Sequence, residues 1–279
     1  MNFILDERSY VKWLIENGTM GKSEKISIRL LLKYYRSLGF TEQEAKDELV
    51  EFMSLNMPFF KAHEWTTLID RLATLVYEQE QELVSVTEVV ISKREMEAIL
   101  SMEDFDCQKI LYMLLVYKKI QNQLHRHVNE WFNGSLGEVF KMARMSGKKS
   151  TTQAQGEMIY LLKEAGLIQL AKSLKSLNLR LSYMDLEPPA TEEDIALTIT
   201  QFDDVIYDFY HYTGHRVVRC QMCGRMIRLK KGERKSRIYC VSCKRIAINE
   251  KSSRCYHRVI EGKTSIIAPL LPLTFENED

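Results

Sequence analysis

The sequence predicts a mainly α-helical protein in three successive parts: a helical N-terminal domain, a middle domain that ends in a β-hairpin, and a small cysteine-bearing module. Three observations predict this fold class. Apolar residues recur at helical spacing behind capping signals in the first part of the chain. In the middle, two short amphipathic stretches precede two alternating ones. Near the C-terminus, four of the six cysteines fall into two C-x-x-C pairs.

Length and composition are those of an ordinary globular protein. The 279 residues are 45% hydrophobic and 28% charged, which leaves room for two or three domains. The first residues, MNFILDERSYVKWL, lack the basic start and apolar run of a signal peptide. No stretch approaches the roughly 18 apolar residues of a membrane span. We therefore expect a cytoplasmic protein without a membrane partner, in which paired cysteines bind metal rather than form disulfides.

Residues 1–83 are predicted to form the helical N-terminal domain. Apolar residues such as Leu31 and Tyr35 recur at helical spacing. Thr41, with Glu44 three residues later, has the pattern of a capping box that begins a helix. No catalytic constellation stands out in this part of the sequence.

Residues 84–185 are predicted to form the middle domain. A second capping box, Ser92–Glu95, precedes apolar helices. Farther on, Ser135 begins a short amphipathic helix, a turn with the sequence SGKKS follows, and a second helix covers residues 151–164. Residues 167–184 alternate apolar and polar side chains, which predicts a hairpin. The second helix is expected to bury Met158, Ile159, Leu161 and Leu162.

Helix, short turn, second helix and hairpin form the outline of a winged helix. In that fold the second helix enters the major groove of DNA, and its first residues face the base edges. The polar and cationic residues at this position are Lys148, Lys149, Thr151, Thr152 and Gln153. Because winged helices also dock proteins, contact with DNA and contact with a protein both stay open here.

Residues 186–214 are predicted to be a linker followed by a helix. The segment LEPPATEED contains a Pro-Pro pair and a third capping pattern, Thr191–Asp194. The apolar residues between Ile195 and Phe209 have 4-3-4-3 spacing, which suits one helix, but ALTIT (196–200) equally suits a strand before a shorter helix.

The two cysteine pairs predict a metal site. Cys220 and Cys223 are separated by sixteen residues from Cys240 and Cys243. Two C-x-x-C turns joined by a loop of this length can place four thiolates around one ion, so we expect one structural Zn²⁺ in a zinc ribbon over residues 215–260. An iron–sulfur cluster is a less favoured alternative, and the lone Cys107 is expected in the core. His215, Cys255 and His257 lie close enough in sequence to replace a ligand.

Positive charge is concentrated in the same segment. Residues 216–258 contain fourteen Lys or Arg and two acidic residues, a net charge of +12, whereas the rest of the chain carries 25 basic and 36 acidic residues, a net charge of −11. Such an asymmetry predicts a polyanion-binding surface. Its expected contact residues are Arg225, Arg228, Lys230, Lys231, Arg234, Lys235, Arg237, Lys244 and Arg245.

Several stretches carry a resemblance to a known group of proteins: LLLKYYRSLGF, ISKREMEAIL with ILYMLLVYKK, and RCQMCGRMI with IYCVSC. The layout resembles uncharacterised phage and prophage proteins of Gram-positive bacteria that have a winged-helix-like middle and a C-terminal zinc ribbon. The resemblance implies a protein related to mobile elements and assigns no catalytic residue. After the ribbon, residues 261–279 are predicted to be a tail.

Two classes of function follow as hypotheses. The first is a zinc-containing nucleic-acid-binding protein, with DNA favoured over RNA, that acts in phage regulation or replication. The second is a phage effector or anti-defence protein that binds a host protein. An enzyme is not expected, because a His-Asn-His nuclease needs a pair of histidines and the sequence after Cys243 has only His257. Homo-oligomerisation is left open by the sequence.

Overall fold

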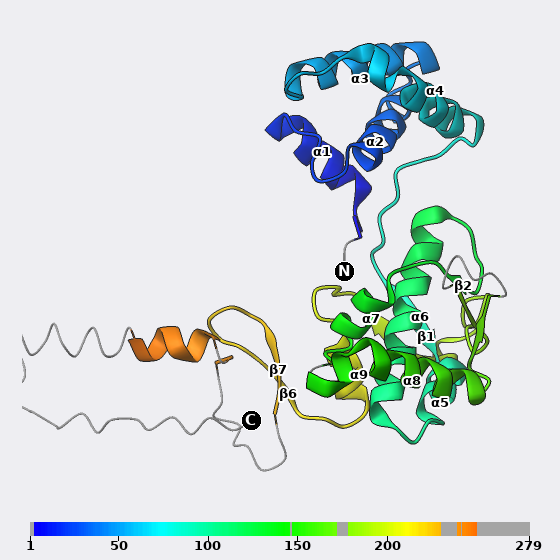
Figure 1. The fold of residues 1–279 in the computed structure, drawn as a ribbon, viewed down its shortest axis with the longest axis vertical. Helices are drawn as coiled ribbons and strands as arrows, with labels where there is room; N and C mark the ends of the chain where they lie inside the picture. Colours follow the sequence, from blue (N-terminus) through cyan, green and yellow to red (C-terminus); the bar gives the residue numbers. More distant parts are fainter. Residues whose placement is uncertain (1–2, 146, 172–177, 230–238, 241, 250–279) are drawn as a thin grey trace, which may run out of the picture. The chain divides into compact units, whose positions relative to one another are not determined.

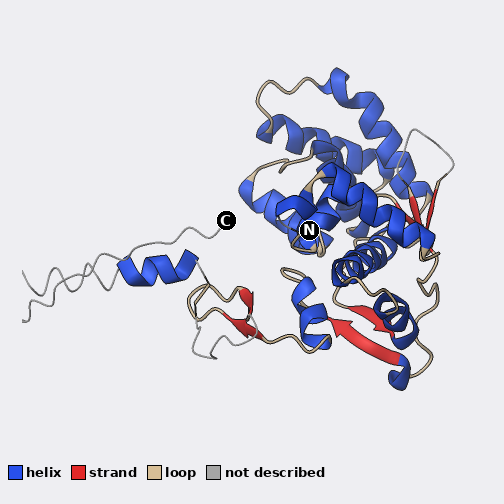
Figure 2. Cartoon of the chain, turned by 60° about the horizontal axis from the view of Figure 1, so that its bottom comes forward, coloured by secondary structure: helices blue, strands red, loops and turns tan. Residues whose placement is uncertain are grey.

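The computed structural model describes residues 3–145, 147–171, 178–229, 239–240 and 242–249. They form a mainly helical protein with small antiparallel sheets (Figures 1 and 2), which confirms the predicted fold class at this level. The chain divides into two compact units, Met1–Phe209 and Tyr210–Asp279. Among the described helices, none is both long enough and apolar enough to cross a bilayer.

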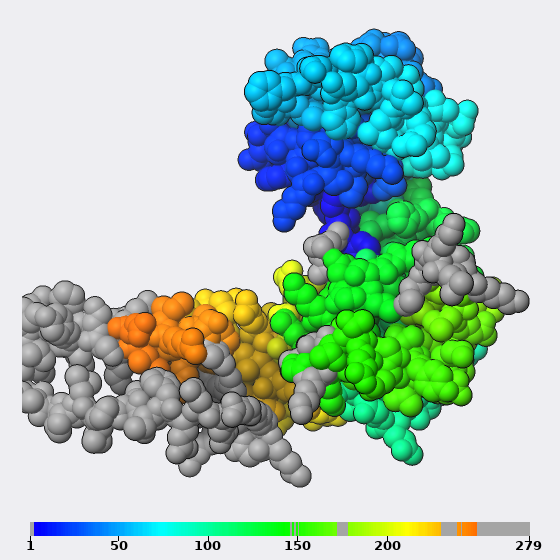
Figure 3. Space-filling model, in the orientation of Figure 1, coloured from blue at the N-terminus to red at the C-terminus, as the bar shows by residue number. Residues whose placement is uncertain are grey.

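The first unit begins with four packed helices, visible as the blue and cyan body in Figure 3. Their shared core contains Leu14, Leu31, Leu49 and Leu72. The predicted capping box at Thr41 is present, because its side chain accepts from the Glu44 amide while the Glu44 side chain bonds back to Thr41. The helices are α1 Glu7–Asn17, α2 Glu24–Ser37, α3 Glu42–Asn56 and α4 Ala62–Glu78.

The remainder of the first unit is built around α6, Phe105–His125, a helix that is buried over most of its length. Beside it lie α5, Lys93–Leu100, and strand β1, Val89–Ser92. The second predicted capping box joins these elements, because Ser92 caps α5 and Glu95 bonds back to the Ser92 amide. Cys107 lies fully buried in α6, as expected.

The buried carboxylate of Glu95 connects three segments. It is fully buried, accepts from the Ser92 amide at 2.9 Å and the Asp185 amide at 2.9 Å, and pairs with Lys119 of α6 at 2.7 Å. A buried charge is tolerated when its oxygens are all bonded in this way. Glu95 therefore completes the capping box of α5 and also connects α5 to α6 and to the segment after the hairpin.

The predicted helix–turn–helix–hairpin succession is present in order. Helix α7, Leu136–Met142, is capped by Ser135, and a 3-10 turn η1, Gly147–Ser150, leads to α8, Thr152–Glu164. The hairpin consists of β3, Ile168–Leu170, and β4, Leu179–Leu181, which pair antiparallel. A third strand, β2, Trp131–Phe132, adds to β4 and gives the order β2-β4-β3.

One expectation about α8 was wrong. Ile159 and Leu162 are buried and Met158 is half-buried, but Leu161 is 51% exposed, beside Tyr160 at 58%. The buried face of α8 is narrower than predicted, so the large side chains of Tyr160 and Leu161 remain at the surface.

Of the two alternatives for residues 195–209, the structure confirms the strand followed by a shorter helix. The structure has β5, Ile195–Ile199, paired antiparallel with β1, and then a shorter helix α9, Ile206–Tyr212. The capping pattern at Thr191 belongs to a 3-10 turn η2, Glu192–Asp194, that leads into β5 rather than to an α-helix. Pairing with β1 supplies hydrogen bonds that the helical spacing alone does not reveal.

Candidate metal centre

The first cysteine pair lies at the end of a short hairpin. Strands β6, Val217–Arg219, and β7, Met226–Arg228, pair antiparallel, with Arg219 opposite Met226. Between them the Cys220 amide donates to the Arg225 carbonyl at 2.8 Å, and the Gly224 amide donates to the Cys220 carbonyl at 2.9 Å. Gly224 has φ +69°, a left-handed conformation that glycine adopts without a steric penalty. The resulting tight turn brings the sulfurs of Cys220 and Cys223 within 4.8 Å of each other.

The second pair lies at the start of a helix. Residues 242–249 are helical, and the Lys244 amide donates to the Cys240 carbonyl at 2.8 Å. The Cys240 amide in turn donates to the sulfur of Cys220 at 3.3 Å, which connects the two pairs. A small core of Ile227, Val218 and Tyr239 packs against the cysteines.

The four sulfurs of Cys220, Cys223, Cys240 and Cys243 lie within 4.8 Å of one another. Bonds of about 2.3 Å from a zinc ion to four tetrahedral thiolates place neighbouring sulfurs about 3.8 Å apart. The Cys223 and Cys240 sulfurs are 3.8 Å apart, which matches this edge and is much longer than the roughly 2.05 Å of a disulfide. The cysteines are free, so the cluster can hold one metal ion.

Protonation of the sulfurs also fits a cation at their centre. Burial works to raise the pKa of Cys220, but hydrogen bonds from the amides of Cys240, Cys223 and Met222 overcome it and lower this pKa to about 6. Hydrogen bonds with the Cys223 and Cys240 sulfurs, together with burial, raise the pKa of Cys243 to about 12. Four thiolates this close together repel one another, which favours a proton on one of them. A divalent cation at their centre offsets this repulsion and therefore favours the thiolate form of all four cysteines.

Three residues near the cysteine pairs, His215, Cys255 and His257, are the alternative ligands predicted from the sequence. His215 is not part of the four-cysteine cluster; its Nδ1 lies 3.0 Å from the Thr213 hydroxyl, and its ring lies 5.7 Å from the ring of Tyr210. Cys255 and His257 lie outside the described residues.

Searches of protein-family models, curated proteins and solved structures found no match. The resemblance to phage and prophage proteins therefore stays a prediction that rests on the quoted motifs. The cysteine geometry carries the functional argument.

The described basic residues around the cluster are exposed. Arg225 lies in the tight turn, Arg228 on β7, and Lys244 and Arg245 in the helix after Cys243. The Arg228 guanidinium lies over the Tyr210 ring, 4.6 Å from its centre, a cation–π contact that could not be predicted from the spacing of the two residues in the sequence. The other predicted contacts, Lys230, Lys231, Arg234, Lys235 and Arg237, lie outside the described residues.

The predicted contacts at the start of α8 have a different environment. Lys149 forms an ion pair with Asp106 of α6. Gln153 donates to Glu157 at 3.0 Å, and Thr151 caps the helix by accepting from the Ala154 amide. Thr152 is exposed, and the side chain of Lys148 lies outside the described part. Among the described side chains at the start of α8, the one cation, Lys149, is thus engaged by a neighbouring acid.

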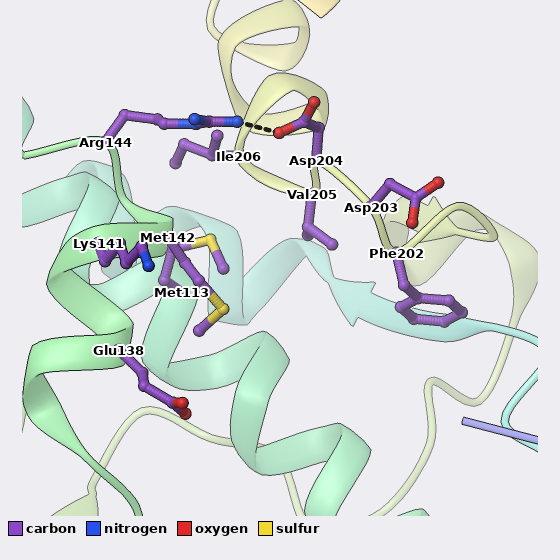
Figure 4. Close-up of a pocket in the computed structure, with 10 residues that line it drawn as sticks. All are labelled: Met113, Glu138, Lys141, Met142, Arg144, Phe202, Asp203, Asp204, Val205 and Ile206. Carbon is purple, nitrogen blue, oxygen red and sulfur yellow. Dashed lines mark hydrogen bonds and ion pairs between the residues drawn. The ribbon is translucent and has the colours of Figure 1, made fainter. Parts of the chain in front are cut away.

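A separate pocket of about 240 Å³ lies in the first unit between α6, α7 and the start of α9 (Figure 4). Its lining includes Met113 and Val205, and an ion pair between Arg144 and Asp204 spans part of it. No residue predicted from the sequence as a site residue lines it.

Proposed function

We propose that the protein binds nucleic acid through a zinc-stabilised module at residues 215–260. The observation that carries the proposal is the four-sulfur cluster, because it stabilises a segment whose described basic side chains are exposed. When bound, Zn²⁺ supplies structural stabilisation and no reaction step. Cys220, Cys223, Cys240 and Cys243 hold it.

The amount of positive charge supports a phosphate ligand. Four thiolates around one Zn²⁺ leave a net charge of −2, whereas residues 216–258 contribute +12. Most of the positive charge is thus not needed to balance the metal site. Exposed Lys and Arg displace counterions from a nucleic-acid backbone, which is the usual source of affinity for such surfaces. Arg228, stacked on Tyr210, would present its guanidinium edge in a fixed orientation.

The proposal extends to the middle domain in a weaker form. The succession α7, η1, α8, β3 and β4 supports a winged-helix-like domain, and this favours DNA over RNA. Since Lys149 and Gln153 are engaged with acidic neighbours, we assign the main contact to the cysteine module. The resemblance to phage proteins supports a regulatory or replication-associated role, with binding rather than catalysis as the activity.

A salt-dependent binding titration tests this function. The full zinc-loaded chain is titrated with duplex DNA, single-stranded DNA and RNA between about 50 and 200 mM salt, the range over which phosphate contacts weaken strongly. The double variant Arg225→Ala, Arg245→Ala should reduce the slope of log affinity against log salt by about 1.8 for duplex DNA, if each contacts one phosphate. The control variant Lys12→Ala, Lys25→Ala removes the same charge from α1 and α2 and should leave the slope unchanged. Equal slopes for both variants contradict the proposed contact.

One observation favours a second candidate function, docking of a host protein by a phage effector. Tyr160 and Leu161 lie exposed next to each other on α8, and the net charge outside residues 216–258 is −11. An acidic surface with exposed apolar side chains fits a basic protein partner better than a nucleic acid. Absence of binding to all three nucleic acids at about 50 mM salt would favour this function.

A further inference from the structure

One of the four cysteines at the metal centre is open to solvent. Cys223 is exposed, whereas the other three members of the cluster are buried: Cys220, Cys240 and Cys243. Cys223 lies in the turn between β6 and β7, next to Gly224, where even an added Cβ would meet no atom within 4 Å. Because cysteine oxidation follows thiolate character and exposure, a small oxidant in solution reaches Cys223 before the three buried cysteines.

A second sulfur lies within reach of this exposed one. The Cys223 sulfur is 3.8 Å from the sulfur of Cys240, which belongs to the other C-x-x-C pair. A disulfide has its sulfurs about 2.05 Å apart, so the two must approach by about 1.8 Å to become bonded. Cys240 is held in place on both sides, because its amide donates to the Cys220 sulfur at 3.3 Å and its own sulfur accepts from the Cys243 amide at 3.5 Å. The exposed sulfur therefore has a positioned partner.

We propose that Cys223 is a site of reversible oxidation by hydrogen peroxide, with Cys240 as the resolving thiol. The Cys223 thiolate attacks one peroxide oxygen, so that an S–O bond forms, the O–O bond breaks and hydroxide leaves a sulfenic acid on Cys223. The Cys240 thiolate then attacks this sulfur; the S–S bond forms, the S–O bond breaks and a second hydroxide leaves. The two hydroxides take protons from solvent. Overall the two sulfurs lose two electrons and the peroxide is reduced to two water molecules.

The disulfide would open the metal centre. It uses two of the four thiolates and leaves Cys220 and Cys243, whereas a structural zinc site has four ligands. The ion is therefore released, together with the stability that it gives the module. A nearby resolving thiol also stops oxidation at the disulfide, which a dithiol reductant reverses by exchange. The inference rests on the metal centre of the proposed function and not on contact with nucleic acid.

Peroxide treatment of the full zinc-loaded chain tests this site. Zinc per chain is measured first, an equimolar amount of hydrogen peroxide is added, and zinc release is followed with a chromogenic indicator against an untreated sample. Remaining thiols are then alkylated and the chain is digested with trypsin. Fragmentation mass spectrometry is needed to locate the disulfide, because the two peptides that it joins, residues 220–225 and 238–244, each contain two cysteines. We expect zinc release together with a disulfide between Cys223 and Cys240, and a dithiol with added zinc should restore the thiols and the metal.

Two histidine variants separate the reacting pair from the other ligands. Cys223→His keeps four ligands of the kinds that zinc accepts but removes the exposed thiol, so peroxide should release its zinc at least about tenfold more slowly. Cys243→His makes the same substitution at a buried ligand and retains Cys223 and Cys240, so its zinc should leave as it does from the unaltered chain. Cys107→Ala, which removes a buried thiol from α6, should also leave the release rate unchanged.

The inference is overturned if peroxide releases no zinc, if the disulfide joins other cysteines, or if zinc leaves Cys223→His as fast as it leaves Cys243→His. Where a histidine variant holds no zinc, the position of the disulfide in the unaltered chain decides. An unaltered chain that holds no zinc before treatment contradicts the metal centre instead, and the location of its disulfide still tests the oxidation of Cys223.

Discussion

Removal of the metal should unfold the cysteine module and leave the first unit intact. The described apolar side chains of the module are few: Ile227 and Leu229 are buried, and Val217, Val218, Met226 and Tyr239 are half-buried. At about 1.5–3 kcal/mol for each fully buried side chain, with a half-buried one counted as half, they contribute about 6–12 kcal/mol. A structural Zn²⁺ contributes roughly 10–16 kcal/mol in comparable finger peptides. The metal is therefore the larger source of stability, and chelation or Cys240→Ser should abolish the folded hairpin.

Limited trypsin digestion measures this directly. The β7 hairpin contains exposed Arg225 and Arg228, which a protease reaches efficiently only when the hairpin opens. We expect a chelator to accelerate cleavage at these two sites at least about a hundredfold, because cleavage follows the population of the open state. Cleavage within α1–α4 should not change. The variant Cys107→Ala is the matched control: it removes a buried thiol from α6 and should leave the metal-dependent protection unaltered. Equal cleavage rates with and without chelator would refute the reasoning.

Three further predictions concern the first unit. Glu95→Ala should lower the free energy of unfolding by about 3–5 kcal/mol, because it leaves Lys119 without its buried partner, whereas the exposed Glu97→Ala on the same helix should have little effect; urea unfolding compares them. Burial raises the pKa of Cys107 from its ordinary value of 9.0 to about 11, so near pH 8 its thiolate fraction, and its alkylation rate measured by mass spectrometry, should be at least about a hundredfold lower than in the unfolded chain. Thr41→Ala should cost about 1 kcal/mol through loss of the α3 cap, and an unchanged urea midpoint would contradict this.

Local features of the fold could be predicted from the sequence because their causes are local. Thr41, Ser92 and Ser135 cap helices as their patterns indicate, since a hydroxyl and an amide three residues apart are brought together by the helix itself. The two C-x-x-C pairs likewise carry their own turn geometry, so a four-sulfur cluster followed from spacing alone.

Features that depend on distant partners were not accessible in this way. Strand β5 forms because it pairs with β1, about a hundred residues earlier, and the alternating and helical interpretations of its sequence were equally good. Contact of Lys149 with DNA stays a prediction, but its ion pair with Asp106 could not be predicted, because Asp106 lies on α6, far from the turn in the sequence. Leu161 is exposed because the elements that pack against α8 decide how much of the helix surface is buried, and helical spacing alone does not indicate this.

Metal analysis of the purified full chain tests the central claim most directly. Inductively coupled plasma mass spectrometry should find one zinc per chain in the unaltered protein, and Cys223→Ser, which removes the one exposed ligand among the four cysteines, should reduce this content. A chain that contains no stoichiometric metal, or whose zinc content is unaffected by the loss of Cys223, would contradict the account.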